Sequence, residues 1–368
     1  GGVHPKENKL SEKSPIKVLA LPKTAIIPLS QNLGAPSNPI VNKGDKVKVG
    51  QLIAESSSFI SSHIHAPVSG TIAKIDEAID SSGYKRKSIF IDVEGDEWLE
   101  NIDKSNHLIS DIRFSKEEII AKIKDAGIVG LGGATFPTHV KLMIPKGKKA
   151  ECLIINGVEC EPYLTSDHRL MIEKGDELMV GIQIIMKSIE VTKAYIGIEN
   201  NKPDAIEHLT NLSKKYNGIE ICPLKVKYPQ GGEKQLIKAI IGREVPSGKL
   251  PIEVGCVVQN VGTAYAVYEA VQKNKPLIER VVTVTGKSVK NPVNLLTRIG
   301  TPVSLLLDEA GSLPDNTGKI INGGPMMGKA VNSLEIPVVK GMSGLLVMPE
   351  KESKRVPIYN CIRCAKCV

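Results

Sequence analysis

Three glycines, an aromatic ring and a lysine lie close together in residues 130–141 of this chain, in the sequence GLGGATFPTHVK. Glycine has no Cβ, so main-chain amides there can approach a phosphate or a flat ring, and the lysine adds a positive charge. The stretch therefore indicates a cradle for a nucleotide cofactor. A glycine-rich loop can also be a plain tight turn, and the rest of the chain has to decide between the two.

Three cysteines form a second chemical motif, CIRCAKC, made of Cys361, Cys364 and Cys367. This spacing is the first part of the bacterial ferredoxin run, and its thiolates can hold three corners of a [4Fe-4S] cluster. As the sequence is written, the fourth ligand would come from a segment after Val368, so we do not expect an intact cluster. Zinc is the rival ligand, but zinc sites usually pair two separate CxxC knuckles.

Composition favours an ordinary soluble globular protein of two or three domains, with 368 residues, 41% hydrophobic and 24% charged. We find neither an apolar run of the roughly 18 residues that a membrane helix needs nor the h-region of a signal peptide. Any attachment to a membrane would therefore go through partners. The other four cysteines are scattered, which argues against a disulfide framework and for a reducing compartment.

The formal charge of +8 indicates a solvated basic surface rather than a face for nucleic acid, because aromatic residues do not interleave with the basic ones. No nucleic-acid partner is expected. An acidic protein partner stays open.

Residues 1–98 read as short strands between glycine and proline turns, a pattern similar to the barrel-sandwich hybrid fold of biotinyl and lipoyl carriers. Residues 51–73 contain no lysine, which excludes covalent attachment of biotin or lipoate there, so the module is structural or interactive. His63 and His65 would lie on the same face of a strand. We expect packing rather than metal binding, because no third ligand is nearby.

Residues 99–275 alternate helices with apolar strands, as in an α/β domain built on a mainly parallel sheet. Ser115 and Glu118 make a capping box for a helix that runs to Ala126, and Gly127 follows as its C-terminal cap. The glycine loop comes next. Strands are expected at 152–156, 194–198, 219–224 and 254–259, and helices at 204–216 and 233–241.

Polar residues cluster where these strands end. Ligands bind beyond the carboxyl ends of parallel strands. We therefore expect four loops, namely the glycine loop and the loops after the first, third and fourth strands, to form one crevice. Each residue also has a local alternative: Asn156 could cap a turn, Glu233 could offset a helix dipole, and Asn260 could be an N-cap. The candidates are Asn156, Glu159 and Glu161 after the first strand, Tyr228, Gly231, Gly232 and Glu233 after the third, and Gln259, Asn260 and Thr263 after the fourth.

Residues 276–345 favour strands again, with a helix candidate at 302–310, and we expect a small β-grasp-like domain. Met326 and Met327 are interpreted as core filler. Residues 346–368 are a basic linker that leads into the cysteines.

In this order the segments resemble the C subunit of the Rnf electron transport complex, a relative of the FMN- and NADH-binding subunit of respiratory complex I. The resemblance covers essentially the whole chain and rests on GLGGATFPTHVK, INGVECEP, YPQGGEKQL, VQNVGTAYA and CIRCAKC. It implies a multidomain α/β fold: a barrel-sandwich hybrid, a Rossmann-like FMN- and NADH-binding domain, a β-grasp domain of the SLBB type, and the start of a ferredoxin-like iron-sulfur segment.

The resemblance also implies site residues. Phe136 would stack on the nicotinamide nucleotide, and Glu161 and Glu233 would contact its polar groups. FMN would be held by Gly130, Gly132, Gly133, Lys141, Asn156, Tyr228, Gly231, Gly232 and Asn260.

Four positions depart from the complex I pattern, and the aromatic residues expected after the YPQGGE helix are missing. These departures affect the NADH contacts more than those to FMN, whose phosphate would be held mostly by backbone and Lys141. The four positions are Leu131, Val158, Gly232 and Gln259.

As the resemblance implies it, the chain is the peripheral subunit of an ion-translocating ferredoxin:NAD+ oxidoreductase, on the cytoplasmic face of the bacterial membrane. It would exchange a hydride between NAD(H) and FMN, and single electrons with [4Fe-4S] clusters, with no protein acid or base. Its partners would be membrane subunits and a ferredoxin-like cluster subunit. A cobalamin-reductase-type flavoprotein and a flavin-free docking scaffold are the alternatives.

Overall fold

The alternating strands and helices between residues 152 and 273 build a four-stranded parallel sheet with the order β11-β10-β9-β12. The computed structural model describes residues 2–354, 357 and 359–365. Apolar side chains alternate between the two faces, so Ile155 packs toward α4 and α7 while Ile154 packs toward α6. The strands are β9 (Cys152–Asn156), β10 (Ala194–Glu199), β11 (Ile219–Leu224) and β12 (Cys256–Asn260).

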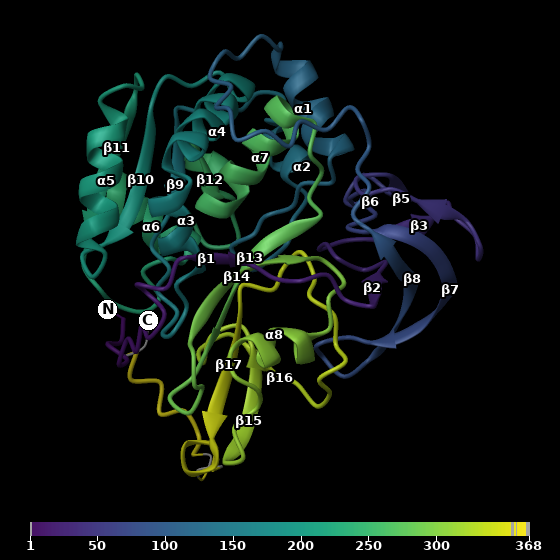
Figure 1. The fold of residues 1–368 in the computed structure, drawn as a ribbon. Coiled ribbons are helices and arrows are strands. Elements are labelled where there is room, and N and C mark those ends of the chain that lie inside the picture. Colours follow the sequence, from purple (N-terminus) through teal and green to yellow (C-terminus); the bar gives the residue numbers. More distant parts are fainter. Residues whose placement is uncertain (1, 355–356, 358, 366–368) are drawn as a thin grey trace.

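The helices of this domain cover both faces of the sheet (Figure 1). The strand expected at 254–259 begins later, at Cys256, because residues Pro251–Val254 form a short 3-10 helix, η1. The helices here are α3 (Ser166–Glu173), α4 (Gly175–Ser188), α5 (Pro203–Ser213), α6 (Glu233–Ile241) and α7 (Val261–Lys273).

Two helices frame the glycine loop. The predicted capping box at Ser115 and Glu118 is confirmed at the start of α1 (Lys116–Asp125). Gly127 follows with φ +63°, a left-handed conformation that favours glycine at a helix end. The loop then leads into the one-turn helix α2 (Thr138–Leu142).

The N-terminal module is a pair of small sheets around a core that includes Ile27, Ile53 and Ile72. His65 is buried, and Nδ1 of His63 accepts the Ser56 N–H at 3.2 Å, which fits packing roles. One sheet contains β2 (Thr24–Pro28), β8 (Lys85–Gly95), β7 (Ser69–Ile79) and β4 (Lys46–Val47), and the other β3 (Asn38–Pro39), β5 (Leu52–Glu55) and β6 (Ile64–His65).

The C-terminal module is a six-stranded mixed sheet backed by α8 (Val303–Glu309). Its edge strand β1 (Ile16–Val18) comes from the N-terminal region and runs parallel to β14, so residues before β2 lie outside the two small sheets. The other strands are β14 (Val293–Arg298), β13 (Glu279–Thr285), β17 (Gly344–Pro349), β15 (Thr317–Asn322) and β16 (Lys329–Ala330), and η2 (Glu350–Glu352) follows.

The interpretation of Met326 and Met327 as core filler is wrong. Their side chains are 39% and 76% exposed. Their backbone makes the specific contacts: both N–H groups donate to the carboxylate of Glu161.

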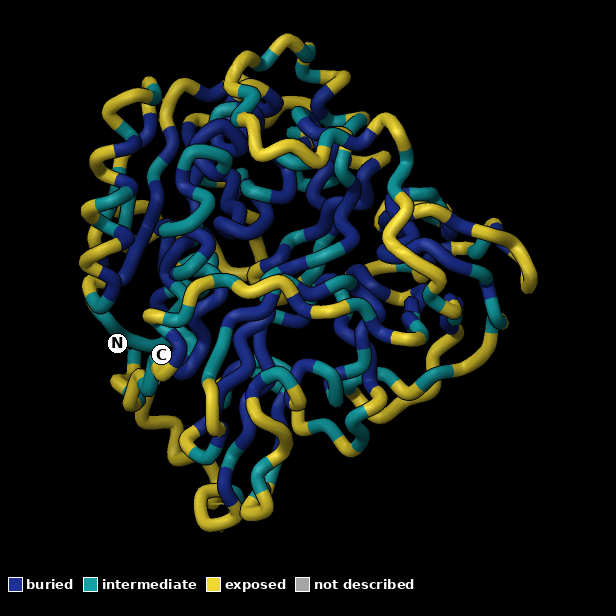
Figure 2. Tube along the Cα trace, viewed as in Figure 1, coloured by how far each residue is buried: buried dark blue, intermediate teal, exposed yellow. Residues whose placement is uncertain are grey.

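Figure 2 shows buried backbone in the interior of the domain and of the two modules, and exposed backbone along their outlines. Together they confirm a mixed α/β, multidomain architecture. Within the described residues we find no helix with both the length and the apolar character that a membrane crossing requires.

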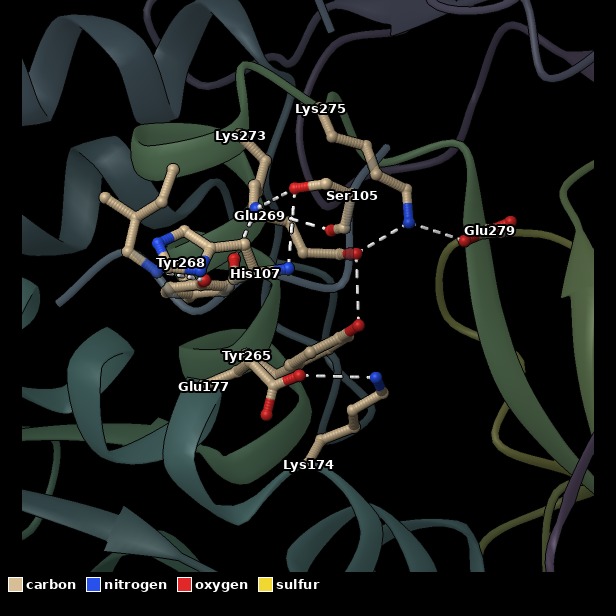
Figure 3. Close-up of polar contacts among 11 residues, drawn as sticks. Ser105, His107, Lys174, Glu177, Tyr265, Tyr268, Glu269, Lys273, Lys275 and Glu279 are labelled. Atoms are coloured by element: carbon tan, nitrogen blue, oxygen red, sulfur yellow. Dashed lines mark hydrogen bonds and ion pairs between the residues drawn. The ribbon is translucent and has the colours of Figure 1, made fainter. Parts of the chain in front are cut away.

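A polar network at the C-terminal end of α7 joins the domains (Figure 3). Glu269 accepts the Tyr265 hydroxyl at 3.0 Å and the Lys275 ammonium at 2.6 Å, and Lys275 also pairs with Glu279 at 2.5 Å. Glu279 pairs in turn with Arg298, whose guanidinium lies 4.7 Å from the Trp98 ring centre. Burial alone would lower the pKa of Lys275, but the two carboxylates outweigh it and raise the pKa.

We predict that Lys275→Met destabilises the protein by about 3 kcal/mol, because the nearly buried Glu269 carboxylate loses its ammonium partner and Glu279 is left with Arg298. The measurement is denaturant unfolding followed by fluorescence of Trp98, the single tryptophan in the sequence, which lies beside the network. Lys43→Met, at an exposed site, is the matched control and should change stability by less than about 0.5 kcal/mol. A Lys275→Met protein as stable as the wild type would show that the network is not a structural joint.

Candidate functional site

The carboxyl ends of β9 and β12 place two asparagines side by side, because Asn156 and Asn260 are register partners on adjacent parallel strands. The Asn260 side-chain amide donates to the Asn156 carbonyl at 3.4 Å. The Asn156 side-chain amide donates to the Gly231 carbonyl at 2.8 Å. Three of the predicted loops therefore touch at one point.

Both asparagines also make the local contacts considered as alternatives. Asn260 is the N-cap of α7 and accepts the Gly262 N–H at 2.8 Å, and Asn156 accepts the Val158 N–H at 3.2 Å. Asn260 has a further partner, the Asp167 carboxylate at 2.7 Å. Capping and cross-loop bonding are thus done by different atoms of the same side chains.

The glycine loop lies against this pair as the fourth loop. Its two ends close on each other through the Gly130 N–H and the Phe136 carbonyl at 2.9 Å, and the Leu131 N–H donates to the Thr263 hydroxyl at 2.9 Å. A Cβ on Gly132 would lie 3.2 Å from the Asn260 Cβ, tighter than ordinary contact. A Cβ on Gly133, at φ +129°, would meet nothing within 4 Å. The loop presses on Asn260 at one glycine and leaves open space at the next.

The start of α6 completes the wall of the site. Gly232 is its N-cap and makes no side-chain capping bond, so the first amides of the helix keep their positive character for another acceptor. The Lys141 ammonium pairs with the Glu233 carboxylate at 2.6 Å, and about a third of each side chain is exposed. The Gly231 N–H points at the Cys160 sulfur, 3.4 Å away.

Residues 157–165, which we call the 157–165 loop, carry both predicted glutamates. Glu159 accepts the Asp167 N–H at 2.7 Å at the start of α3, and Glu161 accepts the N–H groups of Met326 at 3.0 Å and Met327 at 2.7 Å. Glu159 and Tyr163 have left-handed backbone, with φ +47° and +71°. Each such residue costs about 1 kcal/mol or more, so the surroundings must hold this loop in place.

Burial shifts the pKa values of several side chains around the loop. It raises the pKa of Asp167 to about 7, helped by nearby Glu159 and opposed by the bond from Asn260. Burial also raises the pKa of Glu161, although the two backbone N–H groups act in the opposite direction. The pKa of the Tyr228 hydroxyl is raised by burial, so this group is neutral near pH 7.

Two glutamines that flank the site keep one buried polar atom without a partner in the described part of the chain. They are Oε1 of Gln230, just before Gly231, and Nε2 of Gln259, just before Asn260. Buried polar groups normally have partners, so these atoms fit a site that takes a polar ligand or ordered water.

Sequence reasoning missed the side chains that hold the 157–165 loop from elsewhere in the chain. Lys202 is buried and donates to the Val158 carbonyl at 2.8 Å, and burial lowers its pKa to about 8. Lys9 donates to three further carbonyls of the same loop. A lysine in a polar stretch has no local signal for such a role, because its partners are far away in sequence.

The cysteine motif is described only in part. Cys361 and Cys364 are exposed, and Cys367 lies outside the described residues. Over the described residues, no group of three or more His, Cys, Asp or Glu side chains is arranged to hold a metal ion.

Family models match three successive parts of the chain. Residues 1–96 match the RnfC barrel-sandwich hybrid domain, residues 123–269 the Nuo51 FMN-binding domain, and residues 281–330 the SLBB domain. The predicted barrel-sandwich, flavin-domain and β-grasp parts of the fold are thereby confirmed.

Curated relatives match the whole chain. The C subunit of the proton-translocating ferredoxin:NAD(+) oxidoreductase complex of Clostridium ljungdahlii is 46% identical over 372 residues, which is 100% of this chain and 80% of that protein. The C subunit of the Na(+)-translocating complex of Acetobacterium woodii is 45% identical over 370 residues, 100% of this chain and 83% of that protein.

Among solved structures, an NAD+-reducing [NiFe]-hydrogenase in the H2-reduced state has a similar fold, with a TM-score of 0.54 at 21% identity. The match covers 64% of this chain and 47% of that one. Identity above 40% over the whole of this chain, together with the matching family models, identifies the chain as a member of the RnfC family, the C subunits of ion-translocating ferredoxin:NAD+ oxidoreductases.

Proposed function

We propose that this chain exchanges a hydride between NAD(H) and FMN, and single electrons with [4Fe-4S] clusters, as the peripheral nicotinamide end of an ion-translocating oxidoreductase complex. One observation carries the proposal: the glycine loop and three strand-end loops meet at Asn156 and Asn260, inside the segment that matches an FMN-binding domain. When bound, FMN would supply both the hydride and the single-electron chemistry.

The residues present fit FMN. Open space at Gly133 and the close approach of Gly132 to Asn260 would let the loop backbone lie against a flat ring. The uncapped start of α6 and the Lys141 ammonium supply positive charge for a phosphate. The full proposed FMN set is Gly130, Gly132, Gly133, Lys141, Asn156, Tyr228, Gly231, Gly232 and Asn260.

Lys141 would take on the phosphate by sharing its ammonium with Glu233. An ammonium has three donors, so the existing pair leaves two N–H groups for another acceptor. Because both side chains are partly exposed, the pair itself contributes little to stability.

The nicotinamide nucleotide would lie above the flavin and contact Phe136, Glu161 and Glu233. Glu161 is already oriented by the N–H groups of Met326 and Met327, and a carboxylate has further lone pairs for a ribose hydroxyl or amide. The chain's part in hydride transfer is thus orientation and exclusion of water, with no protein acid or base.

Cys361, Cys364 and Cys367 would give three ligands to a [4Fe-4S] cluster, with the fourth from outside this sequence. The protein would sit on the cytoplasmic face of the membrane, held by the membrane subunits of the complex and by a ferredoxin-like cluster subunit. The full-length relatives favour this function over a cobalamin reductase.

Anaerobic mixing of the FMN-loaded chain with NADH tests the proposal. We expect flavin absorbance to bleach with the stoichiometry of one NADH per flavin. A purified chain that is still colourless after incubation with FMN and removal of the unbound flavin would favour the docking scaffold instead.

Lys141→Ala should weaken FMN binding by about tenfold or more, because a charge-assisted phosphate contact is worth about 1.5 to 3 kcal/mol. The melting temperature should hardly change, since only a partly exposed ion pair is lost. Fluorescence titration of FMN is the measurement, and Lys146→Ala, an exposed lysine five residues on, is the matched control. Equal FMN affinity in Lys141→Ala and wild type would refute the phosphate contact.

Glu161→Gln should impair NADH oxidation and leave FMN bound, because glutamine keeps the size but loses the charge and one acceptor oxygen. The measurement is turnover with an artificial electron acceptor, alongside the flavin content. Glu207→Gln, at an exposed position on α5, is the control. Wild-type turnover in Glu161→Gln would count against the assignment.

A further inference from the structure

The N-terminal segment, residues 2–14, runs along the wall of the proposed nucleotide site. Val3 and Tyr228 exchange both backbone hydrogen bonds, each at 2.8 Å. Farther along, the Ser11 and Thr165 hydroxyls lie 2.7 Å apart, and the Asn294 side chain donates to the Ser11 carbonyl at 3.0 Å. The segment is therefore anchored at both ends, at Tyr228 and at Thr165, the last residue of the 157–165 loop.

Between these anchors, Lys9 binds the loop directly. Its ammonium donates to the carbonyls of Glu159 at 2.8 Å, Glu161 at 2.9 Å and Leu164 at 2.7 Å. An ammonium has three N–H donors, so each is used once. The Tyr163 N–H donates at 2.7 Å to the carbonyl of Glu7, on the same segment.

These bonds are made at the two residues of the loop whose backbone is strained. Glu159 and Tyr163 are the two residues with left-handed backbone, a conformation that persists only where the surroundings impose it. The Lys9 ammonium donates to the carbonyl of Glu159, and the Glu7 carbonyl accepts the N–H of Tyr163. Without the ammonium, three converging carbonyl dipoles would repel one another.

The same contacts determine where Glu161 lies. Its backbone carbonyl is bound by Lys9, and its carboxylate is bound by the Met326 and Met327 N–H groups of the C-terminal module. The residue is thus held at both ends by parts of the chain outside the parallel-sheet domain. Losing the backbone restraint would leave only the carboxylate restraint, which the nucleotide would have to share.

We propose that Lys9 is a positioning residue of the nicotinamide nucleotide site: by binding three carbonyls of the 157–165 loop, it sets the backbone from which Glu161 reaches the nucleotide. This inference rests on the function proposed above. It assigns the N-terminal segment a role in catalysis that acts through Glu161 and not through contact with either nucleotide.

Lys9→Met tests the proposal, with Lys6→Met as the control, because Lys6 is exposed on the same segment. We expect the KM for NADH to rise about tenfold or more and FMN affinity to stay within about twofold, because Glu161, which would contact the nicotinamide nucleotide, loses its backbone restraint. The Tyr163 amide should exchange hydrogen at least about tenfold faster in Lys9→Met, with no nucleotide present.

Chemical rescue provides a second test that does not depend on the stability of Lys9→Met. In Lys9→Ala, propylammonium has the missing methylenes and the three donors, so it should restore slow exchange at Tyr163 and lower the KM. Tetramethylammonium has the charge without N–H donors and should restore neither.

Three outcomes would overturn the proposal: an unchanged KM and Tyr163 exchange rate in Lys9→Met, a loss of FMN and NADH binding in equal proportion, or equal rescue by both cations. If the wild-type chain neither binds FMN nor oxidises NADH, the proposed function fails. The Tyr163 exchange and its rescue would then still report whether Lys9 holds the loop.

Discussion

The amide side chain of Asn156 is the contact on which the rest of the site depends. It stands at the carboxyl end of β9, where it donates to the Gly231 carbonyl and lies beside its register partner Asn260 on the edge strand β12. Parallel strands bring their carboxyl ends to one edge, so a single amide there can connect loops that are 75 residues apart in sequence. The glycine loop then packs against Asn260 so closely that a Cβ on Gly132 would lie 3.2 Å from the Asn260 Cβ.

Much of this arrangement could be predicted from the sequence, because it follows from local patterns. Apolar runs separated by amphipathic segments predict the parallel sheet, and polar residues at strand ends predict the crevice. The capping box at Ser115 is a purely local signal and appears as expected. The strand expected from residue 254 begins at Cys256, because a short 3-10 helix ends at Val254. An apolar residue such as Val254 fits a strand or a 3-10 helix, so the hydrophobic pattern could not distinguish the two.

The missed features are long-range. Lys9 and Lys202 bind carbonyls of the 157–165 loop across about 150 and 40 residues, and nothing near either lysine in the sequence indicates this. Met326 and Met327 look like core residues by type, yet the structure uses their backbone N–H groups to orient Glu161. In both cases backbone groups are the partners, and side-chain patterns carry no information about them. The site is therefore assembled by the sheet but held by segments from both ends of the chain.

The central claim is that the glycine loop and three strand-end loops form one flavin site, and amide hydrogen exchange with and without FMN tests it most directly. The account predicts that FMN slows exchange together in residues 130–136, 157–161, 231–235 and 260–263. Protection confined to one of these loops, or located in another part of the chain, would contradict it.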